Sequence, residues 1–70
     1  MVINAVVISF DYSMTHLKVK VQDEQTEEIK TCFVMDELVN KISTDVSYAD
    51  NYKPMEIVES AGYNWIVRLD

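Results

Sequence analysis

The sequence predicts one small α+β domain, in which an antiparallel sheet in the order β-β-β-α-β-β carries a single helix packed on one face. Three observations support this prediction. The chain is only 70 residues long, its two ends are rich in alternating apolar residues, and an apolar stripe of helical spacing lies between them. No repeat, low-complexity tract or linker divides the chain, so residues 1–70 are expected to form a single domain.

The first strand is predicted over residues 2–12, where β-branched residues are frequent. One face of this strand holds Val6, Ile8, Phe10 and Tyr12, and the other holds Ile3, Ala5 and Val7. Because both faces are apolar, the strand is expected to be central in the sheet.

A second strand is predicted over residues 16–21, with one apolar and one polar face. Leu17, Val19 and Val21 are expected to point inward, and His16, Lys18 and Lys20 outward. Outward lysines protect a strand edge against unwanted pairing. A polar connection over residues 22–28 leads to a third strand over residues 29–35, and the two strands are expected to form a hairpin.

A helix is predicted over residues 36–51. Asp36 and Glu37 lie in its first turn, where the helix dipole favours negative charge. Its apolar stripe consists of Leu38, Val39, Ile42, Val46 and Ala49. Tyr48 is expected on the opposite, exposed face. Weak helix formers at residues 43–45 could divide the helix in two, and Pro54 ends it.

The last two strands, residues 55–59 and 63–69, are expected to form a hairpin whose turn holds the only glycine of the chain, Gly62. Four of the five strands are apolar on both faces, whereas one helix of about 22 Å covers a single face of the sheet. The second face can be covered by curling of the sheet into a partial barrel, by a second copy of the chain, or by a foreign protein. Curling is favoured, followed by homodimerisation.

Negative charge is concentrated in the middle of the chain. The whole chain has a net charge of −6, and residues 23–37 carry −5 because they hold six of the twelve acids and one lysine. These acids are Asp23, Glu24, Glu27, Glu28, Asp36 and Glu37. Gathered on one surface, they would attract basic proteins and repel nucleic acid and anionic membranes. Together with Tyr48, a residue type frequent in interface hot spots, they are the predicted partner-binding residues.

The sequence argues against catalysis. A nucleophile needs an oriented base beside it, whereas His16 is predicted on a solvated strand face and Cys32 within a strand. Gly62 alone cannot form a phosphate-binding loop, and one histidine with one cysteine cannot make a zinc site. We therefore expect no enzyme activity, no cofactor and no dedicated metal site.

Direct binding of nucleic acid is also disfavoured. Lys18, Lys20 and Lys30, with Phe33 or Tyr12, superficially resemble a basic aromatic platform, but the net charge has the wrong sign. Mimicry of duplex DNA by the helix fails on charge density, because about 22 Å of duplex carries roughly 13 charges. The predicted helix has four acids and one lysine.

The start of the chain has neither a signal-peptide pattern nor an apolar segment long enough to span a membrane. One unpaired cysteine fits a reducing compartment. We therefore expect a cytoplasmic protein, encoded as a complete small reading frame. A domain of this size is marginally stable and often gains stability from oligomerisation or a partner.

In length, charge and lack of catalytic residues, the chain resembles the small acidic inhibitors that phages and mobile elements direct against host defences, including anti-CRISPR and anti-restriction proteins. This resemblance covers no motif and transfers no site residues. It implies a non-enzymatic inhibitor or regulator, in the cytoplasm of a host cell, that masks a basic nucleic-acid-binding surface of another protein. The alternative is a homo-oligomeric structural or assembly protein that dimerises through its second sheet face.

Overall fold

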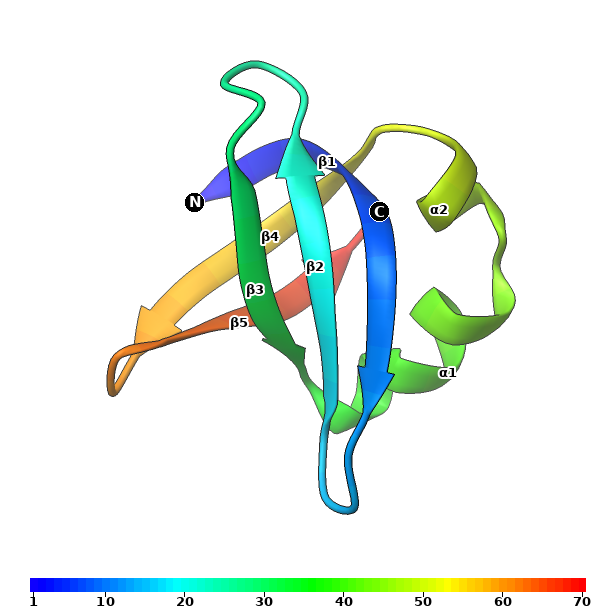
Figure 1. Cartoon of the computed structure of the whole chain (residues 1–70), viewed down its shortest axis with the longest axis vertical. Coiled ribbons are helices and arrows are strands. Elements are labelled where there is room, and N and C mark those ends of the chain that lie inside the picture. Colours follow the sequence, from blue (N-terminus) through cyan, green and yellow to red (C-terminus); the bar gives the residue numbers. More distant parts are fainter.

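The computed structural model describes residues 1–70 and contains five strands and two short helices (Figure 1). They are β1 (Val2–Tyr12), β2 (Leu17–Asp23), β3 (Ile29–Val34), α1 (Asp36–Thr44), α2 (Ser47–Asp50), β4 (Lys53–Ser60) and β5 (Tyr63–Leu69). All five predicted strands are therefore present, with ends shifted by at most two residues. Neither helix is long and apolar enough to cross a membrane.

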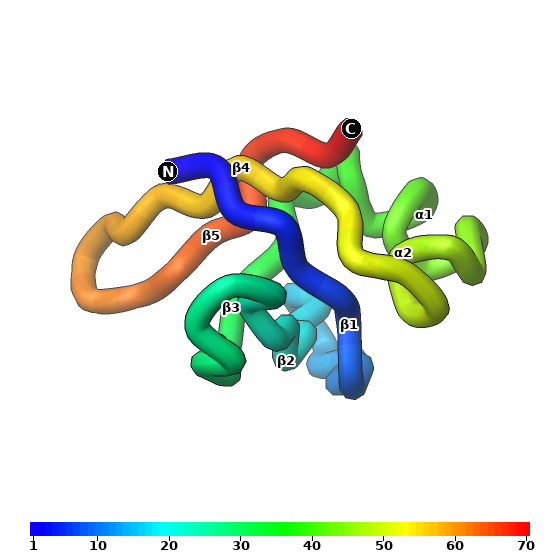
Figure 2. The backbone as a smooth tube through the Cα atoms, turned by 90° about the horizontal axis from the view of Figure 1, so that it is seen from above, coloured from blue at the N-terminus to red at the C-terminus, as the bar shows by residue number.

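The five strands close into a barrel in the order β1-β2-β3-β5-β4, so the predicted antiparallel sheet with one helix packed on a face is wrong, whereas the second face is covered by curling of the sheet, the favoured expectation. β4 returns to pair with the beginning of β1, and β5 lies parallel to β3, whereas all other neighbours are antiparallel. Figure 2 shows β4 and β5 on the side opposite β2 and β3, with β1 running from one side to the other. Closure lets the sheet bury its own second face, which one short helix could not cover.

The core lies inside the barrel and follows the alternation of the strands. Leu17, Val19 and Val21 point inward, as predicted, and they meet Cys32 and Val34 from the neighbouring β3. The remaining buried apolar residues are Ala5, Val7, Ile42, Tyr48, Met55, Ile57, Ile66 and Leu69. A bulge between Val7 and Ser9 bends β1, so its first half pairs with both neighbours while its second half pairs with β2 alone.

The helical segment is divided in two at Asp45, whose extended backbone (φ −89°, ψ 102°) interrupts the helix. Its carboxylate accepts hydrogen bonds from the Ser47 backbone N–H (3.0 Å) and hydroxyl (2.6 Å), and these bonds hold the pKa of Asp45 below its usual value. The break rotates α2 relative to α1. As a result the predicted faces are exchanged: Val46 is exposed, and Tyr48, predicted to be exposed, is buried.

Tyr48 fastens the helical segment to both ends of the last hairpin. Its hydroxyl donates a hydrogen bond to the Asp70 carbonyl oxygen (2.9 Å), and the Lys53 ammonium lies 4.5 Å from the centre of its ring. A fully buried tyrosine whose hydroxyl is satisfied contributes both apolar burial and a hydrogen bond.

We expect Tyr48→Phe to lower the free energy of unfolding by about 1 kcal/mol, because only the bond to Asp70 is lost. Tyr48→Ala should cost about 3–5 kcal/mol, since it also leaves a cavity. Urea denaturation followed by circular dichroism measures both. The control, Tyr52→Ala at a half-exposed ring, should change stability by no more than about 0.5 kcal/mol; equal losses at the two tyrosines would contradict the anchoring role.

Candidate ligand-binding face

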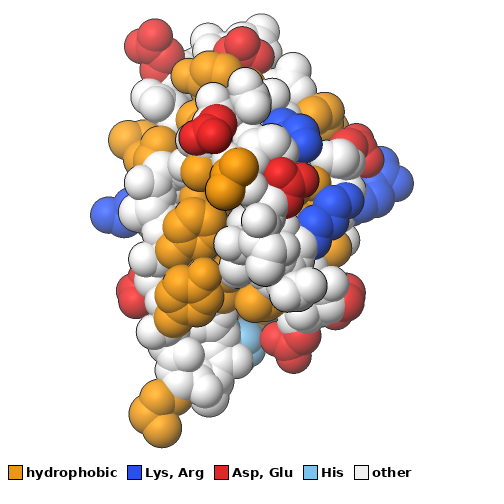
Figure 3. All heavy atoms as spheres, turned by 90° about the vertical axis from the view of Figure 1, so that its right-hand side faces the viewer, with side chains coloured by type: hydrophobic (Ala, Val, Ile, Leu, Met, Phe, Trp, Pro, Cys, Tyr) orange, Lys and Arg blue, Asp and Glu red, His pale blue; other side chains and the backbone are white.

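The six central acids do not gather on one surface. Glu24, Glu27 and Glu28 precede β3, whereas Asp36 and Glu37 follow it, so the two groups lie at opposite ends of this strand (Figure 1). Six residues of strand separate them by about 20 Å. The side of the molecule drawn in Figure 3 likewise shows acidic side chains dispersed among other types. The expectation of a single acidic surface is therefore wrong.

Two of the acids in the β2–β3 loop are engaged within the loop itself. Asp23 is buried, and its carboxylate accepts hydrogen bonds from the backbone N–H groups of Gln25 (2.8 Å) and Thr26 (3.4 Å). Glu28 forms an ion pair with Lys30 (3.1 Å). Asp23 therefore has a local structural role, because its carboxylate satisfies backbone N–H groups of the turn. The sequence pattern alone does not distinguish this role from that of a surface charge.

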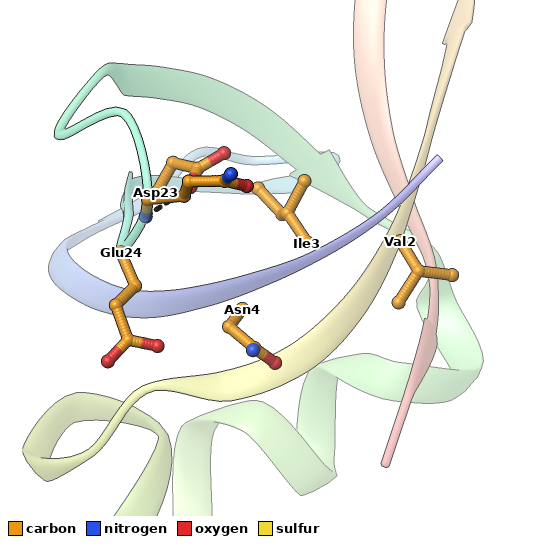
Figure 4. A pocket seen from close by; sticks show the side chains of 6 residues that line it. Val2, Ile3, Asn4, Asp23 and Glu24 are labelled. Atoms are coloured by element: carbon orange, nitrogen blue, oxygen red, sulfur yellow. Dashed lines mark hydrogen bonds between the residues drawn. The ribbon is translucent and has the colours of Figure 1, made fainter.

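Asp23 and Glu24 also line a hollow of about 420 Å³ beside the start of β1 (Figure 4). The Asp23 side chain turns back into the loop, whereas the Glu24 side chain extends away from it. Glu24 and Glu27 thus remain as unpaired acids of this loop. Tyr48, predicted to accompany the acids, is buried and presents no surface to a partner. That the remaining acids bind a partner stays a prediction.

A different group of side chains converges on the outer face of the barrel. Phe33 on β3 pairs with Lys18 on β2 and with Trp65 on β5, which brings three strands together. The Phe33 and Trp65 rings are stacked with their centres 5.0 Å apart. His16 packs edge-on against both rings (5.6 and 5.7 Å), and Tyr63 packs edge-on against Phe33 (5.4 Å). We call His16, Phe33, Tyr63 and Trp65 the aromatic platform.

Two lysines border the aromatic platform. The Lys18 ammonium lies 5.9 Å from the centre of the Phe33 ring, and Lys20 follows on the same face of β2. Two hollows adjoin these lysines. One of about 300 Å³ is lined by Lys18, Thr31, Phe33, Gly62, Tyr63 and Asn64. The other, of about 120 Å³, is lined by Ser9, Asp11, Lys18, Val19, Lys20 and Thr31. Asp11 is the only acid among these residues, so the face has the opposite charge balance to the chain as a whole.

The cluster considered from the sequence consists of Lys18, Lys20 and Lys30 with Phe33 or Tyr12; the structure places Lys18, Lys20 and Phe33 together, without Lys30 or Tyr12, and adds Tyr63 and Trp65. These two residues lie on β5, whose parallel pairing with β3 joins residues about thirty positions apart. Such a long-range pairing has no local signal in the sequence. His16 was predicted to be a solvated edge residue. It is exposed, but its ring contacts Phe33 and Trp65.

Cys32 lies directly beneath the platform, on the inward side of β3, and is fully buried. Burial raises the pKa of its thiol from 9.0 to about 11, although the nearby Lys30 lowers it in part. The thiol is therefore protonated at neutral pH and behaves as a small apolar side chain.

The order of the elements defines the class of fold. A meander of three strands, a helical segment and a hairpin that closes a five-stranded barrel have the topology of the OB-fold. Comparison of the chain with protein-family models, with curated proteins and with solved structures finds no match. The likeness is thus one of topology, and a function has to be argued from the side chains.

The buried thiol makes stability depend on pH in a defined direction. In the unfolded chain Cys32 ionises near pH 9, whereas in the folded protein it keeps its proton up to about pH 11. Stability is therefore fully present below pH 9 and falls as the pH rises toward 11, by about 2–3 kcal/mol. Urea denaturation midpoints across this range measure the decline. Cys32→Ala should remove that part of it, and an equal decline in the variant would assign the effect to other groups.

Proposed function

We propose that the aromatic platform binds single-stranded nucleic acid. The observation that supports this proposal is the convergence of four rings, from β3, β5 and the residue that precedes β2, on one outer face bordered by Lys18 and Lys20. Proteins that bind single strands combine such rings, on which bases stack, with cations that follow the phosphates. The same face of OB-folds binds oligonucleotides and oligosaccharides, which is an analogy of fold and only adds to the argument.

The sizes of two effects decide whether nucleic acid can bind: the free energy of base stacking and the repulsion by the negative net charge. Each base stacked on a ring contributes about 1–3 kcal/mol, and it does so independently of the sign of the protein's charge. The acids that precede β3 lie about 15 Å or more from Phe33 along the strand, beyond a Debye length of about 8 Å at physiological ionic strength, so their repulsion is largely screened at the platform. Asp36 is nearer, because it lines the same hollow as His16, and it opposes binding on that side, whereas Lys18 and Lys20 border the side near Phe33 and Tyr63.

The platform selects for single strands because a duplex hides the faces of its bases. Tyr63 is 57% exposed and is the first residue of β5, next to the β4–β5 turn at Gly62. The hollow beside it is lined by the polar side chains of Thr31 and Asn64 as well as by Phe33. A base placed there can stack on a ring and present its edge to hydrogen-bonding groups, which is how unpaired bases are recognised.

The two functions expected from the sequence remain hypotheses of other classes. In the first hypothesis the acids dock on a basic protein surface. These acids form two separate groups at the two ends of β3, and Glu24 and Glu27 are the unpaired acids of the loop before it. Titration with a basic peptide alongside an oligonucleotide distinguishes it: binding of the peptide alone would favour acidic docking and overturn the platform.

Tyr63→Ala should weaken binding of a single-stranded oligonucleotide of about ten residues. We expect a loss of about 1–3 kcal/mol, or roughly 5- to 150-fold in Kd, because one stacking surface disappears. Fluorescence anisotropy of a labelled DNA or RNA strand measures it. Tyr52→Ala, at a half-exposed tyrosine outside the platform, is the matched control; equal losses in both variants would refute a specific stacking role.

The salt dependence of binding should be shallow, because only Lys18 and Lys20 border the platform. Two phosphate contacts on a single strand give a slope of log Kobs against log salt concentration of about −1.4, and Lys18→Ala should reduce it to about −0.7. Anisotropy titrations at several salt concentrations measure both slopes. Binding without any salt dependence, and unchanged by Lys18→Ala, would indicate an uncharged ligand such as an oligosaccharide.

A further inference from the structure

We propose that an apolar hollow beside Trp65 holds the methyl group of a thymine base, so that the chain prefers single-stranded DNA containing thymine to strands that carry uracil instead. This inference rests on the proposed nucleic-acid binding and adds the class of base that the aromatic platform selects. The hollow lies where β4 borders β5, on the side of Trp65 away from Phe33.

The hollow has a volume of about 250 Å³ and is almost wholly apolar. Its lining consists of Met35, Val58, Ser60, Trp65 and Val67. The hydroxyl of Ser60 is the only polar side-chain group among these residues, and none of them is charged. The hollow therefore offers no cation to a phosphate, and it differs from the hollow beside Tyr63, which is lined by polar side chains as well as rings.

Strand register places this hollow in line with the rest of the platform. Phe33 on β3 is the direct partner of Lys18 on β2 and of Trp65 on β5. Trp65 in turn is the direct partner of Val58 on β4. Because directly paired residues share a face of a sheet, these four residues form one row across the outside of four strands. The row begins with the cation of Lys18 and ends at Val58, about 14 Å away at roughly 4.8 Å per strand.

Trp65 joins the hollow to the stacking surface. Its ring stacks on that of Phe33 with their centres 5.0 Å apart, and it also lines the hollow, where Val58 is 41% exposed. A base packed against Trp65 at this end of the row is therefore bordered by the side chains of Val58 and Val67 rather than by polar groups. The group that such a base presents to the hollow has to be apolar, since a donor or acceptor would lose its water without gaining a partner.

Thymine is the base that fits this lining. Its C5 methyl group is the one apolar group on the edges of the four DNA bases, and apolar side chains are its usual contacts in proteins. Uracil has the same hydrogen-bonding groups and lacks only this methyl. A difference in affinity between thymine and uracil strands therefore reports on the methyl group and not on the number of rings, hydrogen bonds or phosphates.

Competition of unlabelled strands of about ten deoxythymidines or deoxyuridines against a labelled DNA strand tests the inference. The two competitors share sugar, phosphates and length. We expect the thymine strand to bind about two- to fourfold more tightly, because complete burial of one methyl group is worth about fourfold in Kd. Fluorescence anisotropy measures both dissociation constants.

Val58→Thr should abolish this preference and leave the affinity for the uracil strand unchanged, because it replaces one methyl of the lining by a hydroxyl of similar size. Val2→Thr is the matched control, since Val2 is also an exposed strand valine (56%) but lies outside the hollow. It should retain the preference. Tyr63→Ala should weaken binding of both strands by the same factor. Circular dichroism verifies that each variant is folded.

Equal binding of the two strands by the unchanged protein would overturn the inference and leave the proposed binding of single strands intact. A thymine preference that persists in Val58→Thr would also overturn it, since stronger stacking of the methylated base would then account for the difference. Failure of both strands to bind would refute the proposed function and the inference together.

Discussion

The parallel contact between β3 and β5 is the constraint on which the rest of the structure depends. It is short, joining Cys32–Val34 to Asn64–Ile66, and is extended by a hydrogen bond from the Met35 N–H to the Ile66 carbonyl oxygen (3.2 Å). Without it the five strands form a curved sheet with an exposed inner face. With it, Val34 and Ile66 are buried inside the barrel, and Phe33 and Trp65 are stacked on its outside. Core and candidate site are thus consequences of one pairing.

The sequence predicted what depends on neighbours along the chain. The alternation of Leu17, Val19 and Val21 identified the inward face of β2, and the strands appeared at the expected places because a period of two is a local signal. The surplus of apolar faces favoured curling of the sheet, but which strands meet at the closure could not be predicted in the same way. No local sequence feature near residue 33 or residue 65 indicates that the two residues are neighbours. The handedness and length of the connection between β3 and β5 are compatible with several strand orders.

Tyr48 and the acids show a second kind of failure. The predicted helical stripe runs through residues 43–45, which are weak helix formers, but the break at Asp45 exchanges the faces beyond it, so that Val46 is exposed and Tyr48 is buried. For Asp23–Glu37, adjacency in sequence likewise does not give adjacency on the surface. Because β3 runs between the two halves of this segment, their charges lie a whole strand apart. A local charge sum therefore describes a surface only when no extended strand divides it.

The distribution of aromatic residues gives the strongest reason to look for function on the surface. Of seven aromatic residues only Tyr48 is fully buried; the other six are half-buried or exposed. Full burial of such a side chain, compared with full exposure, contributes about 1.5–3 kcal/mol, so the exposed parts of these six represent several kcal/mol in a domain whose core seldom supplies more than about 3–5 kcal/mol of net stability. A small domain that leaves most of its largest apolar groups outside its core forgoes stabilisation it could use. Phe33, Tyr63 and Trp65 cluster on one face, and Phe10 with Tyr12 on one edge. The clustering of Phe33, Tyr63 and Trp65 on one outer face is what stacking of a ligand on that face would require.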